Sequence, residues 1–129
     1  RGTEGSAGID FFVPEDYPNN LCTVEPGERY FIPSGIKANV PEGYALIAMN
    51  KSGVSLKKSL MVGACVVDSD YQGEIHLHLV NTGFQPAVIE PGEKLTQFLH
   101  QCAQLMHRIG TAQRLMEHCL LLGSRVLVM

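Results

Sequence analysis

The chain has 129 residues, 45% of them hydrophobic and 18% charged, with a formal net charge of −3. This length suits one domain that buries a core of its own. The absence of any Lys/Arg run argues against nucleic acid as a partner, so a phosphate-binding site would have to be local. We see no signal peptide and no apolar run long enough to cross a bilayer, which predicts a soluble, intracellular protein of the cytoplasm or nucleus.

Residues 1–100 carry β-strand signals throughout. Apolar runs over 30–32, 35–40 and 44–49 predict strands, because each is short and bounded by turn-forming residues. The turn signals are Pro26-Gly27, Pro33-Ser34-Gly35, Pro41-Glu42-Gly43 and Pro91-Gly92. Many short strands with Pro/Gly turns are typical of a sandwich, jelly roll or barrel, so we predict an all-β fold. Residues 51–60 show no alternation and are predicted to form a short helical turn or a loop.

The segment 63–74 joins an apolar run to two acids, an aromatic ring and a glycine, and 75–79 then alternates between apolar and polar residues. This pattern predicts a β-hairpin whose mouth forms a pocket large enough for a sugar. His76 and His78 fall on one face of its second strand. Because a third ligand is not evident nearby, a polar or intersubunit strand face is a better interpretation than a metal pair.

The character of the chain changes after residue 100. Apolar residues between 101 and 116 recur at spacings near three and four, which predicts an amphipathic helix despite Gly110. We therefore divide the chain into a β-domain over 1–100 and a distinct tail over 101–129. The cysteines show no C-x-x-C spacing, which argues against a zinc site or redox pair and predicts buried free thiols in a reducing compartment. They are Cys22, Cys65, Cys102 and Cys119.

Four ordered motifs resemble those of the trimeric deoxyuridine triphosphatase (dUTPase) family. They are Ser6-Ala7-Gly8-Ile9-Asp10, Asn50-Lys51-Ser52-Gly53, the segment 63–74, and Pro91-Gly92-Glu93-Lys94-Leu95-Thr96-Gln97. Their order and spacing make the set much more specific than any single motif. The resemblance implies a distorted jelly roll of the β-clip type, and a homotrimer whose sites combine motifs from neighbouring subunits. It also implies Mg²⁺-dependent hydrolysis of dUTP to dUMP and diphosphate.

The two ends of the chain depart from this family pattern. The family's first strand is apparently missing before the first motif, and the fifth motif, a glycine-rich C-terminal arm, has no counterpart in 101–129. A replaced C-terminus and a frame slip would both explain the tail. Since the arm closes over the triphosphate in the family, its absence predicts weakened turnover.

The resemblance assigns the nucleoside half of the site to the segment 63–74. Asp68 would contact the sugar 3′-hydroxyl and act as general base on the attacking water, although a turn-forming Asp is the alternative. Tyr71 would lie under the deoxyribose and exclude a 2′-hydroxyl, or else be an ordinary cross-strand aromatic. Gly63 and Val67 would present backbone groups to the uracil edge, and a side chain at position 63 would block the base.

The resemblance assigns the phosphate half to the other three motifs. Lys51, Ser52 and Gly53 would cradle the phosphates, with Lys51 replacing the family's arginine and losing its planar fork. Gln97 matches a phosphate-binding glutamine, and a solvent-facing strand residue is the alternative. Asp10 would hold water ligands of Mg²⁺, which needs only one or two protein carboxylates beside substrate phosphates. A turn-forming Asp is again the alternative.

Two other functions fit parts of the pattern. The dCTP deaminase family is similar in fold and in several motifs, but it carries its catalytic Glu at the place of His78 and Gly-Trp at the place of Asp70-Tyr71. A nucleotide-binding or regulatory homologue would keep the pocket without the catalytic closure. Comparing dUTP binding with diphosphate release separates these hypotheses.

Overall fold

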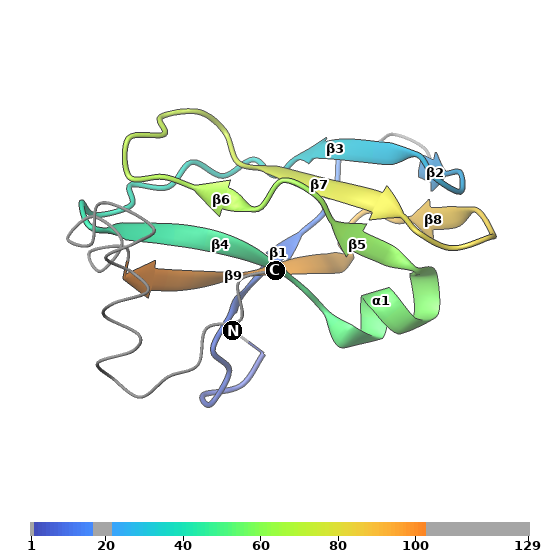
Figure 1. Cartoon of the computed structure of the whole chain (residues 1–129), viewed down its shortest axis with the longest axis horizontal. Coiled ribbons are helices and arrows are strands. Elements are labelled where there is room, and N and C mark those ends of the chain that lie inside the picture. Colours follow the sequence, from blue (N-terminus) through green and yellow to red (C-terminus); the bar gives the residue numbers. More distant parts are fainter. Residues whose placement is uncertain (1, 17–21, 103–129) are drawn as a thin grey trace, which may run out of the picture.

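The computed structural model describes residues 2–16 and 22–102, which are almost entirely β-structure (Figure 1). The strands are β1 (Ile9–Phe12), β2 (Cys22–Val24), β3 (Arg29–Pro33), β4 (Tyr44–Asn50), β5 (Leu60–Val62), β6 (Val66–Val67), β7 (His76–Asn81), β8 (Ala87–Ile89) and β9 (Lys94–Cys102). The predicted all-β class is confirmed. The strands predicted over 30–32 and 44–49 lie within β3 and β4.

The short helix α1 (Ser52–Lys58) occupies the segment without alternation, as predicted. It ends at Ser59, whose left-handed backbone (φ 54°) lets its N–H bond to the carbonyl of Ser55. No helix in the described ranges is long and apolar enough to cross a membrane.

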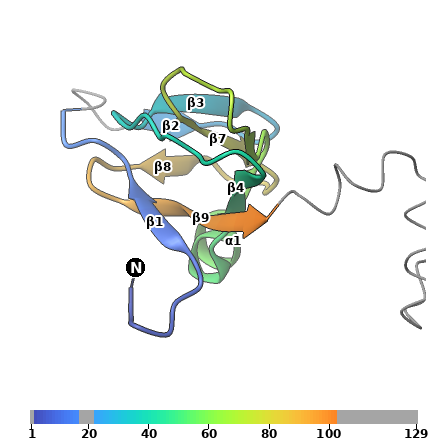
Figure 2. The ribbon, with the colours of Figure 1, turned by 90° about the vertical axis from the view of Figure 1, so that its left-hand side faces the viewer.

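Within the described residues the strands form three antiparallel sheets. Their orders are β1-β9-β4-β6, β3-β7-β5 and β2-β8 (Figures 1 and 2). β9 lies between β1 and β4, so the first motif sits beside the fourth, with Asp10 directly opposite Gln97. Sequence-distant motifs are thereby joined at one sheet.

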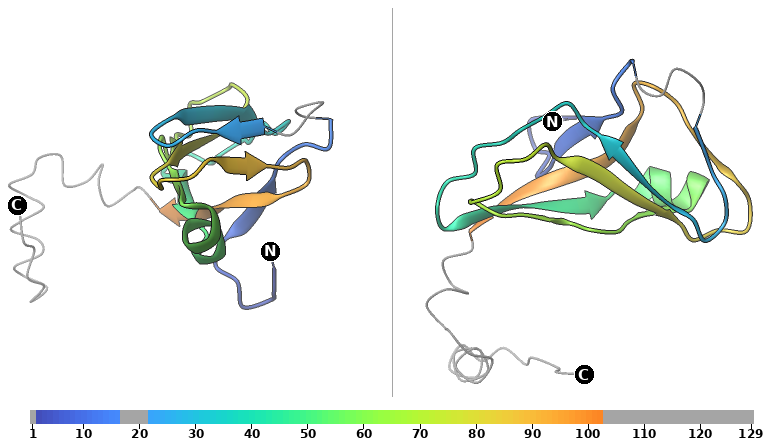
Figure 3. Two further views of the ribbon diagram at one scale, coloured as in Figure 1. Left: turned by 90° about the vertical axis from the view of Figure 1, so that its right-hand side faces the viewer. Right: turned by 90° about the horizontal axis from the view of Figure 1, so that it is seen from above.

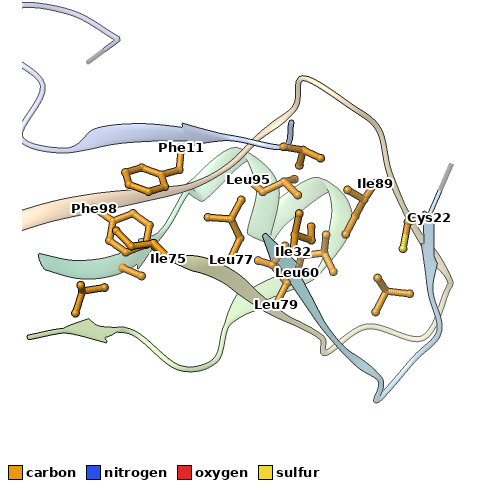
Figure 4. Close-up of a cluster of buried hydrophobic side chains, with 14 of the residues drawn as sticks. Phe11, Cys22, Ile32, Leu60, Ile75, Leu77, Leu79, Ile89, Leu95 and Phe98 are labelled. Carbon is orange, nitrogen blue, oxygen red and sulfur yellow. The ribbon is translucent and has the colours of Figure 1, made fainter. Parts of the chain in front are cut away.

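The core fills the space between the sheets (Figure 4). In β7, Leu77 and Leu79 point inward and are about 1% exposed, whereas His76 and His78 take the opposite face, as the period of two requires. Phe11 and Phe98 bring β1 and β9 together with ring centroids 4.2 Å apart. Burying each such side chain contributes about 1.5–3 kcal/mol, so the core supplies the main stabilisation.

The Pro/Gly dipeptides form turns because their glycines adopt positive φ. Gly27 has φ 80° and Gly92 has φ 78°, values that follow a proline naturally in a type II turn. The turn at Pro91-Gly92 leads directly into β9 and places Lys94 and Gln97 on it.

One predicted strand was wrong, and one predicted helix does not begin where expected. Residues 35–40 form no strand, because Pro33 ends β3 and Gly35 turns with φ 73°, and the segment then makes only isolated bonds such as Ile75 N–H to the Ile36 carbonyl. Gln101 and Cys102 continue β9 against β4 rather than starting a helix. The rest of the predicted helix and tail, 103–129, lies outside the described residues, and the boundary at residue 100 stays a prediction.

The predicted hairpin also differs from the structure. β7 pairs with β5 through Val62 opposite Leu79, but β6 leaves it to pair with β4, in another sheet. Burial of Val67 and the bond from Ala48 N–H to the Cys65 carbonyl (2.7 Å) hold β6 there. The segments before and after residues 68–74 therefore diverge, which opens a pocket between them.

The cysteines in the described ranges are all free thiols. Cys22 is buried as predicted, but Cys65 is only partly buried and Cys102 is exposed. The prediction of burial was therefore wrong for Cys102, which lies at the end of β9.

Candidate functional site

A pocket of about 280 Å³ opens where β6 diverges from β7, and we call it the β6–β7 pocket. Its wall is mostly apolar and comes from three segments of the chain. The lining residues are Phe31, Ala64, Cys65, Val66, Val67, Tyr71, Ile75, His76 and Phe98. Predominantly apolar walls with a few polar groups are typical of small-molecule sites.

Tyr71 is fixed at the rim of this pocket. Its hydroxyl donates to the Glu74 carbonyl (2.7 Å), and a Cβ at Gly73 would lie 2.6 Å from that hydroxyl oxygen. Gly73 is thus the residue that lets the ring fold back over the loop. With 44% of the residue exposed, the ring can offer a face to a bound molecule.

Asp68 follows β6 and starts the turn that carries Tyr71. The turn is closed by the backbone, since Tyr71 N–H donates to the Asp68 carbonyl (3.2 Å). The side chain is exposed, and within the described part of the chain nothing donates a hydrogen bond to its carboxylate. The turn does not use the carboxylate, which favours a functional role over the Asx-turn alternative.

Gly63 lies against His78, which the sequence pattern assigned to a polar or intersubunit strand face. The N–H of Gly63 donates to the His78 carbonyl (2.9 Å), and the next N–H, of Ala64, donates to His78 Nδ1 (2.6 Å). A Cβ at position 63 would lie 2.5 Å from the His78 ring. A side chain at position 63 would therefore clash with the His78 ring, whether or not a nucleobase is bound.

Asp10, Lys51 and Gln97 form a second polar group, which we call the β1–β9 cluster. Lys51 Nζ lies 2.5 Å from Asp10 Oδ1, and Lys94 Nζ lies 3.7 Å from Oδ2. The Asp10 side chain is only 9% exposed. Its pKa is held below the ordinary value chiefly by the Lys51 hydrogen bond, against the opposing effect of burial, so the carboxylate is charged at neutral pH.

Gln97 is held in place by two neighbours. Its Nε2 donates to the Asn50 carbonyl (3.0 Å), and a Cβ at Gly8 would lie 2.7 Å from its Oε1. The first motif thus needs glycine at this position because the amide packs directly on the backbone.

Asn50 links the second motif to the third. Its Oδ1 accepts the N–H of Val62 (2.7 Å), the residue before Gly63. The sequence analysis assigned Asn50 no role. The signal that could have revealed it was its place in the second motif.

Ser52 and Gly53 are exposed in the first turn of α1, directly after Lys51. The hydroxyl and backbone at this point face solvent beside the cluster. Among the described residues, no group of three His, Cys, Asp or Glu side chains could hold a metal ion. His76 and His78 therefore form no such site with a third described ligand.

The pocket and the cluster share no residue. Figures 1, 2 and 3 place the loop between β6 and β7 far from α1, with the sheets between them. Val67 and Tyr71 line the pocket, and Gly63 and Asp68 flank it in the chain. The other predicted residues, namely Asp10, Lys51, Ser52, Gly53 and Gln97, do not line it.

The fold, the mostly apolar pocket and the separate carboxylate–lysine cluster define a small all-β domain with two candidate ligand-binding regions. The family model described as dUTPase matches residues 1–119. The chain belongs to the dUTPase family.

Relatives and solved structures agree with this assignment. The chain is 41% identical over 97 residues to a deoxyuridine 5′-triphosphate nucleotidohydrolase of Chlamydia pneumoniae, covering 74% of this chain and 65% of the relative. It is 38% identical over 101 residues to the enzyme of that name from Finegoldia magna, covering 77% and 68%. The chain thus spans about two thirds of the length of these relatives.

The dUTPase of Streptococcus mutans has a similar fold, with a TM-score of 0.68 at 28% identity over 79% of this chain and 82% of that one. The dUTPase from phage phi11 of S. aureus gives a TM-score of 0.69 at 22% identity, over 79% and 80%. The predicted fold type is confirmed.

Proposed function

We propose that this chain is a dUTP diphosphatase, which hydrolyses dUTP to dUMP and diphosphate with Mg²⁺. The observation that carries the proposal is the β6–β7 pocket, with Tyr71 on its rim and Asp68 after the strand that forms its wall, in a member of the dUTPase family. The relatives named above bear the name of this activity.

The β6–β7 pocket would hold the deoxyuridine. Uracil would meet the backbone around Gly63 and Val67, where a strand edge can imitate a pairing partner, and the sugar would lie on Tyr71. Asp68 would then contact the 3′-hydroxyl and take a proton from the attacking water. Its exposed carboxylate, which no described group engages, is compatible with that role.

The β1–β9 cluster and the start of α1 would hold the phosphates. Lys51 would neutralise charge on the leaving diphosphate, while Ser52, Gly53 and the Gln97 amide would donate to phosphate oxygens. Lys51 is already paired with Asp10, which fixes its direction before substrate arrives.

The residues present fit a magnesium ion that is held through water. An ionised carboxylate offers about four acceptor positions, and Lys51 takes one of them at Oδ1. Mg²⁺ keeps several waters and takes substrate oxygens as further ligands, so one carboxylate is enough. When bound, the ion would neutralise the triphosphate. The phage phi11 family member is described with a structural Mg(II) ion.

A homotrimer would bring the two halves of the site together. In one chain the loop between β6 and β7 and the helix α1 lie at different ends of the described structure (Figure 3). Neighbouring copies related by a closed rotation would place the pocket of one beside the cluster of the next.

The environment of His78 argues against the deaminase alternative. Its Nδ1 accepts the Ala64 N–H, and its Nε2 is buried, so neither ring nitrogen is open to exchange a proton with a nucleobase in the pocket. No observation favours the regulatory alternative over the enzyme.

The release of diphosphate from dUTP, dCTP, dTTP and UTP with Mg²⁺ tests the function. We expect strong preference for dUTP, because the thymine methyl would meet the strand and cytosine would reverse a donor and an acceptor. Equal turnover of the four nucleotides would contradict the assignment. Binding of a dUTP analogue without diphosphate release would instead support the regulatory alternative.

A further inference from the structure

His78 touches the β6–β7 pocket from behind, without lining it. Its ring stacks on Phe31 with centroids 4.0 Å apart and planes 15° apart, and its Nδ1 accepts the N–H of Ala64. Phe31 and Ala64 both line the pocket. One side chain therefore holds two segments of the pocket wall, one from β3 and one from the start of the diverging loop.

These contacts require one protonation state. Because Nδ1 is an acceptor, the proton of the neutral ring is on Nε2, which is buried and has no hydrogen-bond partner among the described residues. Protonation would put a hydrogen on Nδ1, facing the Ala64 N–H, and break the bond. Burial and, secondarily, the charge of Arg29 on β3 lower the pKa of His78 from 6.5. The other titratable groups on these elements are Tyr30 on β3, His76 on the same face of β7, and Cys65 in the loop.

We propose that His78 is a positioning residue that fixes the pocket wall through the Ala64 N–H and releases that wall when it is protonated. Nucleotide affinity should therefore fall in acid, below pH 6.5. The inference rests on the proposed function, because it takes the β6–β7 pocket as the nucleoside site. A positioning residue of this kind changes substrate binding more than the chemical step.

Two variants of His78 distinguish the effect of its Nδ1 acceptor from the effect of its ring stacking on Phe31. Asn at position 78 can place its Oδ1 where Nδ1 lies, which keeps an acceptor that does not titrate, whereas Phe keeps a ring on Phe31 without an acceptor. His100→Asn is a matched control, because His100 is exposed, stacks on Tyr44 at 4.6 Å, and does not line the pocket.

The dissociation constant of a non-hydrolysable dUTP analogue is measured for each protein across pH, together with kcat and KM for dUTP. We expect His78→Phe to weaken binding about fivefold at neutral pH, the usual effect of one hydrogen bond, with little change in kcat. His78→Asn should bind like the unmodified chain at neutral pH but lose the acid dependence, which His100→Asn should keep. Equal acid dependence in all four proteins would overturn the proposal.

A spectroscopic readout keeps this test independent of the proposed function. Nitrogen chemical shifts of His78 should report the Nε2–H tautomer, and the Ala64 amide resonance should shift with the titration of that ring. If the chain failed to bind dUTP but showed these signals, the proposed function would be wrong and the His78 switch correct. An unprotonated Nε2, or an Ala64 amide that ignores the titration, would refute the switch even in an active enzyme.

Discussion

The proposed role of Asp68 as the general base can be tested by replacing one oxygen of its carboxylate. Asp68→Asn keeps the shape of the exposed side chain and the backbone turn to Tyr71 but removes the proton acceptor. We expect dUTP hydrolysis to fall by about two to four orders of magnitude, the usual contribution of a general base, while analogue binding falls much less. Diphosphate release and analogue titration measure the two effects.

Asp70→Asn is the matched control, because Asp70 is exposed in the same turn. It should leave turnover close to that of the unmodified chain. Comparable losses in the two variants would show that the charge of the loop matters and that Asp68 has no special role.

Asp10 predicts how stability depends on pH. Its pKa is lower in the folded chain than the ordinary 3.8, so folding favours the charged form. This contribution is present in full above 3.8 and is lost as the pH falls through the folded pKa. The urea unfolding midpoint of Asp10→Asn should therefore decrease less at low pH than that of the unmodified chain. Asp16→Asn, which changes an exposed carboxylate, should show the same decrease at low pH as the unmodified chain. If Asp10→Asn also shows the full decrease, the ion pair between Asp10 and Lys51 does not contribute to stability.

At the level of elements, Asn81 joins the end of β7 to β2 and to the turn before β8. It is fully buried, and its Nδ2 donates to the carbonyls of Val24 and Gln85, both at 2.8 Å. Its Oδ1 accepts the Gly83 N–H at 2.9 Å. These bonds help to attach the small β2-β8 sheet to the rest of the domain, together with its buried side chains such as Val24 and Ile89.

Asn81→Leu keeps the volume of the side chain but leaves those three backbone groups without a hydrogen-bond partner. We expect the free energy of unfolding to fall by about 3 kcal/mol or more, since each buried group left without a partner costs about 1–3 kcal/mol. Chemical denaturation measures the loss, and Asn39→Leu, at an exposed position, should change stability little. A similar small change at Asn81 would mean that water replaces the lost bonds.

Strands were predicted correctly where their own apolar residues define them. The predictions were wrong where pairing with a distant strand decides whether a strand forms and which sheet it joins. β3, β4 and α1 followed from their own residues, and Pro26-Gly27 and Pro91-Gly92 from turn chemistry. Residues 35–40 have strand composition but no ladder partner. β6 joins β4 because burial of Val67 favours that sheet, which no local pattern encodes.

The candidate site was predictable as motifs but not as contacts. The resemblance assigned Asp10 and Gln97 to the same half of the site, and the pairing of β1 with β9 places them opposite each other. The roles of Asn50 and His78 depend on bonds to Val62 and Ala64, residues far along the chain that carry no pattern of their own.

At the scale of the whole molecule, two inactive variants should restore each other. Lys51→Gln damages the phosphate half and Asp68→Asn the nucleoside half. If each site combines two copies, mixed trimers from equal amounts should contain both intact halves in about a quarter of their sites. Co-refolded mixtures assayed for diphosphate release test this, with the double variant mixed with either parent as the control. No recovery above the separate proteins would place the whole site within one chain.

If a homotrimer joins the two halves of the site, as proposed, catalysis also depends on the protein concentration. A chain that carries only the two unjoined halves of a site has no complete centre when it is alone, so dilution would remove activity without unfolding anything. Substitutions at a contact between copies would then act as catalytic mutations, although they touch neither nucleotide nor metal. Chains with different defects would complement one another in a cell that makes both, and a copy damaged in both halves would remove the site that it shares with each of its two neighbours.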